Sequence, residues 1–252
     1  MVFLKSKKEL ELMRAACEIS AEALRLGGEA VRPGVSTWEI DRVIHEFIKS
    51  QGAAPNFMEN GFPASACVSV NEEVIHGIPS KSKILQPGDI VSIDTGALYK
   101  GYNGDNAATF PVGEIAPEHK TLLETTKAAL YSGIEAAVAG NRVGDISNAV
   151  ETSARARGFG VVREFVGHGI GRELHEEPEV PNYGSKGRGR RLAAGMTLAI
   201  EPMITLSGDS IVILDDGWTV VAESGKYAAH FEHTIAVTEN GPEIYTLAWE
   251  RS

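Results

Sequence analysis

The spacing of hydrophobic residues in the first half of the chain predicts two helices followed by short strands. Apolar residues recur at helical spacing within residues 7–30, at Leu10, Met13, Cys17 and Leu24. A second helix is predicted to begin at the capping-box sequence Ser36-Thr-Trp-Glu39 and to end near Gly52. From residue 64 to 112 short β-branched runs predict strands, at 67–70, 89–94 and 105–112.

The second half of the chain repeats this order. Pro117 suits the first turn of a helix over 117–138, and another helix is predicted over 145–157. Strands are expected near 161–166, 197–206, 210–213, 218–223 and 229–238. We therefore predict an α+β fold in which helices back a curved antiparallel sheet. No long polar linker interrupts it, so residues 1–252 are expected to form one domain of two related halves, about 1–112 and 113–252.

Corresponding positions in the two halves carry similar residues. Gly34, Ile40 and Gly52 match Gly140, Ile146 and Gly158 at a separation of 106. Leu85, Gly88, Val91, Ile93 and Asp94 match Leu192, Gly195, Leu198, Ile200 and Glu201 at a separation of 107. The pattern indicates a degenerate duplication, although such short matches also arise by chance before strands.

Each half ends its repeated segment in an acid, Asp94 or Glu201, and supplies one more, Asp105 or Glu232. If the halves fold alike and face each other, four carboxylates converge in one cleft. Four such anions repel one another by several kcal/mol unless cations lie between them. The pattern thus predicts a metal site; the alternative is that these acids are solvated residues at strand ends.

Composition narrows the class of protein. The chain of 252 residues carries a formal net charge of −10, which argues against a dedicated nucleic-acid or membrane-surface protein. Two cysteines, Cys17 and Cys67, imply no disulfide framework. There is neither an apolar signal segment nor a run of ~18 apolar residues, so we expect a cytoplasmic protein. The basic loop 184–191 is either a solvated connection or a contact for phosphate.

The glycine-rich segment 167–178 contains two histidines, His168 and His175, seven residues apart. A lone histidine is more often structural, but these two accompany the four separated acids. Imidazole together with carboxylates suits Mn²⁺, Fe²⁺, Co²⁺ or Zn²⁺, and the scarcity of thiolates argues against a structural zinc site. A pair of such ions would activate a water molecule and polarise a carbonyl group.

The order and spacing of five of these residues resemble the metal ligands of methionine aminopeptidases, namely Asp94, Asp105, His168, Glu201 and Glu232. The segments 71–79, 167–178, 199–203 and 231–234 match the same family. The resemblance extends from about residue 5 to 248 and, without a zinc-finger extension, looks like the short type I enzymes of bacteria and organelles. It implies the pseudo-twofold "pita-bread" fold and removal of the initiator methionine from peptides and nascent chains whose second residue is small. Separately, we expect a monomer, because the sequence shows no obvious oligomerisation stripe.

The resemblance also implies a role for each residue. Asp94 would bind one divalent ion, His168 and Glu201 the other, and Asp105 and Glu232 would bridge both. The ions would be Co²⁺, Mn²⁺, Fe²⁺, Zn²⁺ or Ni²⁺, and a bridging water or hydroxide would attack the peptide bond. Four further roles follow: Glu201 as the base, His76 near the scissile amide nitrogen, His175 near the carbonyl oxygen, and Phe62, Cys67 and Trp218 around the methionine side chain. Ordinary core packing is the alternative for the last three.

Two positions depart from the family pattern. Segment 57–61 is one residue shorter than in many members, and His230 stands where the family usually has glutamine. A Xaa-Pro dipeptidase or aminopeptidase P shares the fold and five ligands but usually carries another N-terminal domain. The other alternative is a binding protein that has lost its metals. Because the substrate emerges at the ribosome, the loop 184–191 is a candidate ribosome contact.

Overall fold

Four long helices within the described residues, 2–250, occur in two successive pairs. In this computed structural model α1 (Lys7–Ala30) and α2 (Thr37–Ser50) form the first pair, and α4 (Pro117–Ala136) and α5 (Val143–Arg155) form the second. The predicted range of α1 is confirmed. Helix α4 ends two residues before the predicted residue 138, and α5 lies two residues earlier than predicted.

A capping box begins each helix of the first pair. The Ser36 hydroxyl accepts a hydrogen bond from the backbone N–H of Glu39 (3.2 Å), and the Glu39 carboxylate accepts one from the backbone N–H of Ser36 (2.8 Å). Ser6 and Glu9 form the same reciprocal pair. These bonds satisfy donors that a first helical turn leaves without partners, so the predicted start of α2 is confirmed.

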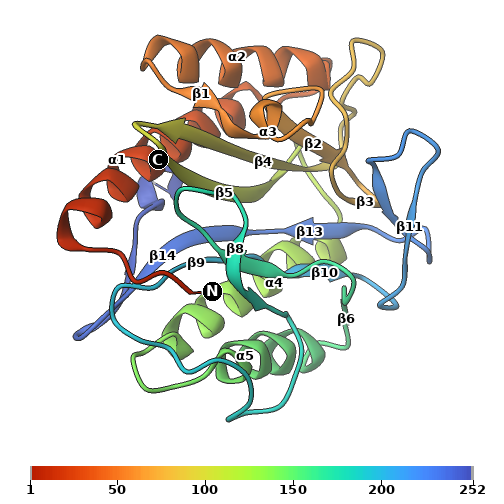
Figure 1. Ribbon diagram of the computed structural model, residues 1–252. Helices are drawn as coiled ribbons and strands as arrows, with labels where there is room; N and C mark the ends of the chain where they lie inside the picture. Colours follow the sequence, from red (N-terminus) through yellow and green to blue (C-terminus); the bar gives the residue numbers. More distant parts are fainter. Residues whose placement is uncertain (1, 251–252) are drawn as a thin grey trace.

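One curled antiparallel sheet of nine strands lies between the helix pairs, with α1 and α2 above it and α4 and α5 below in Figure 1. Its main path is β1-β4-β5-β14-β9-β7-β8, with β2 beside β4 and β15 beside β14. Its strands are β1 (Ala54–Pro55), β2 (Ala66–Val70), β4 (Ile90–Tyr99), β5 (Tyr102–Pro111), β7 (Gly167–Gly169), β8 (Glu176–Val180), β9 (Thr197–Ile200), β14 (Glu232–Thr238) and β15 (Gly241–Ile244). The predicted α+β fold, with helices backing a curved antiparallel sheet, is confirmed.

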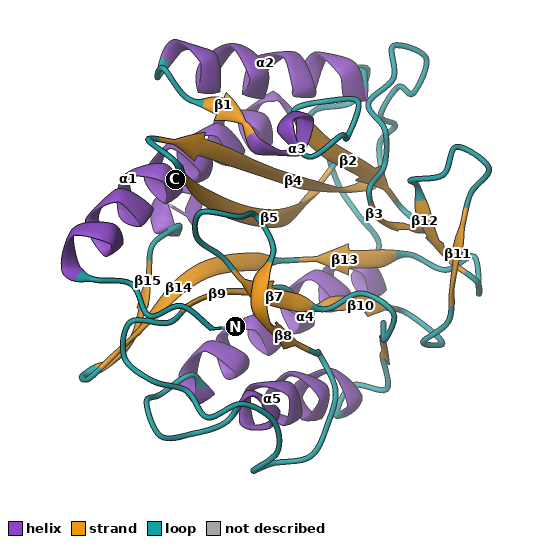
Figure 2. Ribbon diagram, viewed as in Figure 1, coloured by secondary structure: helices purple, strands orange, loops and turns teal. Residues whose placement is uncertain are grey.

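Two three-stranded sheets complete the β structure and are visible at the right of Figure 2. One joins β13 (Ala228–His230), β10 (Met203–Thr205) and β6 (Gly160–Val161); the other joins β11 (Ile211–Ile213), β12 (Val220–Ala222) and β3 (Glu73–Ile75). A short helix α3 (Asn56–Glu59) and a 3₁₀ turn η1 (Leu247–Glu250) are the remaining elements. Among residues 2–250, each helix is too short or too polar to cross a bilayer.

Several strands differ from their predicted ranges. The run 197–206 divides into β9 and β10 at Glu201-Pro202, and the run 229–238 divides into β13 and β14 at Phe231. Proline has no N–H for a strand ladder, which accounts for the first break. The predicted strand 161–166 is only the two-residue β6. Strands β1, β3, β7, β8 and β15, together with α3 and η1, were not predicted because segments this short carry little periodicity.

Backbone hydrogen bonds recur in the two halves at the spacing of the sequence repeat. The N–H of Gly34 donates to the carbonyl of Leu85 (2.8 Å), and the N–H of Gly140 donates to the carbonyl of Leu192 (2.9 Å). Gly34 and Gly140 both have positive φ, 86° and 100°, a conformation that glycine adopts without steric cost. The repeated glycines therefore join each helix pair to its own part of the sheet through the same turn.

Helix packing repeats in the same way. A Cβ atom on Gly27 of α1 would lie 2.7 Å from Ile44 and 3.7 Å from Ile93. A Cβ atom on Gly133 of α4 would lie 2.8 Å from Val150 and 3.3 Å from Ile200. Gly27 and Gly133 are 106 residues apart, as are Ile44 and Val150, while Ile93 and Ile200 are 107 apart. Both helix pairs thus approach the sheet closely at equivalent glycines, directly behind Asp94 and Glu201.

Candidate metal centre and substrate cavity

The five residues predicted to bind metal lie on five neighbouring strands of the central sheet, or next to one. Asp94 is on β4, Asp105 on β5, Glu232 on β14 and His168 on β7, while Glu201 directly follows β9. These strands are adjacent in the order β4-β5-β14-β9-β7. Residues up to 138 positions apart in the sequence, from Asp94 to Glu232, are therefore neighbours across the sheet.

Strand register places these side chains on one face of the sheet. Asp94 pairs with Ala107, and Ala107 pairs with Glu232 on its other side. Asp105 is two residues from Ala107, so its side chain points to the same face. On the other half His168 pairs with Ala199, two residues before Glu201. Because side chains alternate along a strand, this register brings all four carboxylates and the imidazole together.

The orientation of His168 suits it to bind a cation. Its Nδ1 lies 2.9 Å from the carbonyl oxygen of Gly169, which only accepts, so Nδ1 carries the proton. Nε2 therefore presents a lone pair and lies 3.4 Å from Oε1 of Glu201. Burial, and next the neighbouring His175, lower the pKa of His168 to about 3. A neutral imidazole whose other nitrogen is fixed by a carbonyl is the usual state of a histidine metal ligand.

Asp105 and Glu232 are buried and Asp94 and Glu201 are partly buried, without enough partners to stabilise four charges. Burial raises the pKa of Asp94 to about 7 and that of Glu201 to about 8. Burial, and next the neighbouring carboxylates, raise the pKa values of Asp105 and Glu232 well above the usual range. One oxygen each of Asp94, Asp105 and Glu232 has no hydrogen-bond partner among residues 2–250.

These observations fit a divalent metal site. One ligand atom each of Asp105, His168 and Glu232 lie within 4.8 Å of one another, and all three residues are buried. A cation between them would neutralise the carboxylates and accept the free imidazole lone pair. The donor set, one nitrogen and several carboxylate oxygens with no thiolate, is typical of Mn²⁺, Fe²⁺, Co²⁺ or Zn²⁺.

One cavity of about 150 Å³ adjoins this cluster, and every residue predicted for the site lines it. The residues of the predicted site are His76, His175, Phe62, Cys67 and Trp218 together with the five candidate metal ligands. Phe57, Asn60 and Leu174 also line the cavity and were not predicted. Phe57 and Asn60 lie at α3, in the segment that departs from the family pattern, which was the one signal that pointed to them.

Two histidines lie where they would face a substrate beside the metal ligands. His76 has a positive φ of 58°, a strained conformation for a residue with a side chain, and its ring packs edge-on against Phe165. Burial lowers the pKa of His76 to about 4, so the ring is neutral near pH 7. The exposed His175 lies at the cavity mouth, its ring centroid 4.4 Å from that of His168.

The remaining wall of the cavity is apolar. The ring of Phe62 packs edge-on against Trp218 with centroids 5.2 Å apart, and Phe57 packs edge-on against Phe62 at 6.4 Å. Cys67 pairs with Asp94 in the sheet, which places its buried side chain on the metal face. Burial raises the pKa of Cys67, so it remains a thiol. Aromatic rings and sulfur form a surface that attracts a polarizable thioether.

Comparisons with known proteins agree with this geometry. The model of metallopeptidase family M24 matches residues 11–239. A methionine aminopeptidase of Clostridium acetobutylicum is 50% identical over 98% of this chain and 99% of its own length. The crystal structure of methionine aminopeptidase from Thermotoga maritima is 44% identical with a TM-score of 0.96, covering 98% of this chain and 99% of that one. A Xaa-Pro dipeptidase from Bacillus anthracis is 26% identical with a TM-score of 0.77, and the match covers 96% of this chain but 61% of that one.

Metal binding should stabilise the fold, because it neutralises buried carboxylates. At ~100 times the dissociation constant, Co²⁺ should add about 2.7 kcal/mol of stability to the metal-free protein, or roughly 5–10 °C in Tm. Asp105→Asn should raise the Tm of the metal-free protein by relieving repulsion, and should remove most of the Co²⁺ effect. Asp215→Asn, at an exposed carboxylate, is the matched control and should change neither value. Equal Tm values with and without Co²⁺ in the wild type would contradict a metal site.

Proposed function

Because the chain belongs to metallopeptidase family M24, we propose that it is a metal-dependent aminopeptidase that releases N-terminal methionine from peptides and nascent chains whose second residue is small. The observation that carries this proposal is the single cavity in which five candidate metal ligands, two histidines and an aromatic pocket meet. The relatives named methionine aminopeptidase support the same activity. We propose one catalytic domain over 1–252, with halves 1–112 and 113–252, on the repeated turns and helix packing described above.

The ligands divide between two divalent ions in this proposal. Asp94 would hold one ion, His168 and Glu201 would hold the other, and Asp105 and Glu232 would contribute to both. Asp105 and Glu232 are both buried, lie with His168 in the group whose ligand atoms are within 4.8 Å of one another, and each have an oxygen without a hydrogen-bond partner among residues 2–250, which supports their bridging role. When bound, divalent ions at such a site supply an activated water and polarise the scissile carbonyl.

Three side chains of the cavity carry the proton and oxyanion chemistry. Glu201 receives the proton of the attacking water, a role that suits a carboxylate that lines the cavity beside the other candidate ligands. His175 at the cavity mouth donates a hydrogen bond to the carbonyl oxygen as negative charge develops on it. His76 contacts the amide nitrogen that becomes the leaving group, and its strained backbone holds the ring at that position.

The apolar end of the cavity selects methionine. Phe62, Cys67 and Trp218 surround a space of limited volume, and Phe57 narrows it further. A thioether fits among aromatic edges and a thiol without leaving a polar group unsatisfied. The ordinary core role for these residues accounts less well for their position, since all three line the cavity.

Neither alternative function fits as well. The solved Xaa-Pro dipeptidase shares the fold but is 26% identical with a TM-score of 0.77, against 44% and 0.96 for the solved methionine aminopeptidase. A binding protein without metals would gain nothing from four clustered carboxylates with little access to solvent, because each uncompensated charge costs folding free energy. Both considerations favour the aminopeptidase.

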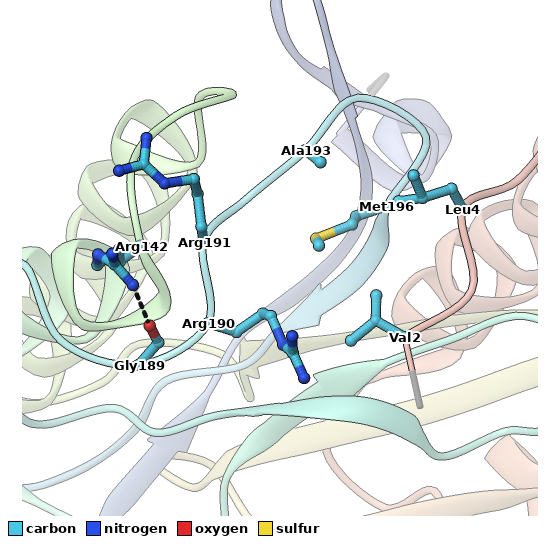
Figure 3. Close-up of a pocket in the computed structure, with 8 residues that line it drawn as sticks. All are labelled: Val2, Leu4, Arg142, Gly189, Arg190, Arg191, Ala193 and Met196. Carbon is cyan, nitrogen blue, oxygen red and sulfur yellow. Dashed lines mark hydrogen bonds between the residues drawn. The ribbon is translucent and has the colours of Figure 1, made fainter.

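The loop 184–191 is the proposed contact with the ribosome. Arg188, Arg190 and Arg191 are exposed, and Arg142 donates a hydrogen bond to the Gly189 carbonyl (2.9 Å), which holds the loop against α5. Figure 3 shows three of these arginines, all but Arg188, on one side of a cavity of about 650 Å³ whose other side is apolar. Guanidinium groups bind phosphates, which ribosomal RNA presents. We also propose that the protein acts in the cytoplasm and as a monomer.

Cleavage should follow the size of the second residue of the peptide. Met-Ala-Ser and Met-Gly-Ser should be hydrolysed far faster than Met-Leu-Ser, because a bulky second side chain meets the cavity wall. Steric rejection of this kind can exceed the ~1–3 kcal/mol attached to one methylene. Chromatographic assay of released methionine measures it, and N-acetylated Met-Ala-Ser is the control that should resist cleavage. Equal rates for Met-Ala-Ser and Met-Leu-Ser, or preference for Ala-Pro peptides, would count against the proposal.

Replacement of His175 should lower turnover and leave the metal content of the protein unchanged. Loss of one oxyanion donor costs about 10²–10³ in kcat. His175→Ala should therefore retain two equivalents of Co²⁺ by elemental analysis while losing that much activity on Met-Ala-Ser. His119→Ala, which alters a partly buried histidine of α4 outside the cavity, should retain both. A metal-free His175→Ala protein would show that His175 is a ligand instead.

Ribosome binding should depend on the loop arginines more than on overall charge. Replacing Arg188, Arg190 and Arg191 together by Glu should weaken cosedimentation with bacterial ribosomes by roughly tenfold or more at low salt. Replacement of Lys8, Lys49 and Lys120 by Glu is the matched control, since these exposed residues carry the same charge elsewhere. If both triple variants lose equal affinity, the contact is not made through this loop.

A further inference from the structure

His230 is a buried histidine whose ring has no hydrogen-bond partner among residues 2–250. Only 1% of the residue is exposed, and neither Nδ1 nor Nε2 is bonded. Most buried polar atoms in folded proteins are hydrogen-bonded, so two unsatisfied nitrogens on one ring require an explanation. An apolar side chain of similar size would fill the same space without this cost.

The backbone of His230 is held firmly in place. Its N–H donates to Oγ1 of Thr109, and the Thr109 hydroxyl donates in turn to the carbonyl of His230, both at 2.9 Å. His230 also pairs with Met203 between β13 and β10. The ring therefore extends from the end of a fixed strand, two residues before Glu232. Its position is set by these backbone hydrogen bonds and not by any contact of the ring nitrogens.

The nearest carboxylate to this ring is that of Glu201. Nε2 of His230 lies 3.7 Å from Oε2 of Glu201, while Nε2 of His168 lies 3.4 Å from Oε1 of the same group. The two oxygens of Glu201 thus face two different imidazoles. Hydrogen bonds between nitrogen and oxygen span about 2.7–3.2 Å. A side-chain rotation that moves either atom by less than ~1 Å would therefore bring Nε2 of His230 within hydrogen-bonding distance of Oε2 of Glu201.

We propose that His230 is a positioning residue that donates a hydrogen bond from Nε2–H to Oε2 of Glu201 and thereby aims Oε1 at the ion bound by His168. This inference rests on the proposed function, in which Glu201 is a metal ligand. Partners of this kind orient the ligands of metal sites and raise metal affinity.

Direct metal binding by His230 is the main alternative, and the geometry favours the positioning role. Nε2 of His230 approaches Oε2 of Glu201, whereas Nε2 of His168 approaches Oε1, so the two imidazoles contact different oxygens of one carboxylate. A donor to Glu201 also explains why the position holds a polar side chain in a buried setting, since a carboxylate oxygen that binds no metal needs a donor.

Two replacements of His230 separate the roles. His230→Leu removes the donor and keeps the ring's approximate size, whereas His230→Gln keeps an N–H donor. Apo-proteins would be titrated calorimetrically with Co²⁺ under anaerobic conditions, and their Tm values measured without metal. His119→Leu is the matched control, because His119 is partly buried against the Tyr227 ring at 4.1 Å and lies outside the metal cluster.

We expect His230→Leu to raise the Tm of the apo-protein or leave it unchanged, since it removes unsatisfied nitrogens. The same variant should weaken Co²⁺ binding at the site formed by His168 and Glu201 by about 10–100-fold. His230→Gln should recover the wild-type dissociation constant to within about threefold, and His119→Leu should match the wild type. Unchanged Co²⁺ affinity in His230→Leu, or equal loss of Co²⁺ affinity in both His230 variants, would overturn the positioning role.

A measurement on the wild type does not depend on the folding of any variant. In the Zn²⁺-loaded protein, ¹⁵N NMR of the imidazoles should show His230 protonated at Nε2 and unmetallated. A proton on Nδ1 alone, or a metallated Nε2, would refute the proposal. Failure of the wild type to bind Co²⁺ or to release methionine from Met-Ala-Ser would instead refute the proposed function.

Discussion

Four carboxylates on one face of a curled sheet are the constraint on which the rest of this structure depends. They cannot all be ionised so close together in a buried place unless cations lie among them. The strand register makes the arrangement unavoidable, because Asp94, Ala107 and Glu232 form a row across three strands and Asp105 lies two residues along from the middle of it. The small Ala107 at the centre of this row leaves room for what must neutralise the acids.

Each half of the chain contributes strands and acidic residues to that face of the sheet. Each supplies one acid from the strand behind which its helices pack, Asp94 in front of α1 and α2 and Glu201 in front of α4 and α5. Ile93 and Ile200, the residues just before these acids, point the other way and contact the helix glycines Gly27 and Gly133 in equivalent positions. Core packing and ligand placement are therefore two sides of the same strands, and a shift of either helix pair would move a ligand.

The sequence predicts the long helices and the acids of this site well, and the short strands and the cavity wall poorly. The four long helices and the pairing of acids with the repeat were predicted, because long periodic segments and a constant spacing leave a clear pattern. Strands β7 and β8 were not, since three glycine-rich residues and a short acidic run show no alternation. Phe57 and Leu174 reach the cavity from segments far apart in the chain, so their contribution depends on tertiary structure. The position of His230 beside Glu201 likewise follows from the break between β13 and β14, which hydrophobic spacing did not reveal.

Half of the buried side-chain atoms that lack a hydrogen-bond partner among residues 2–250 lie where the chemistry is proposed. They are one oxygen each of Asp94, Asp105 and Glu232 and both ring nitrogens of His230, while the cluster of buried apolar residues behind the sheet draws on both halves. A fold selected only for stability would replace these groups, since each costs folding free energy when left unpaired. Their retention makes sense if a ligand completes them, and the strained His76 at the same cavity fits the same reasoning. His230 belongs with these acids, because its ring nitrogens also lack a partner in the core and Glu201, the group nearest to Nε2, is a candidate metal ligand.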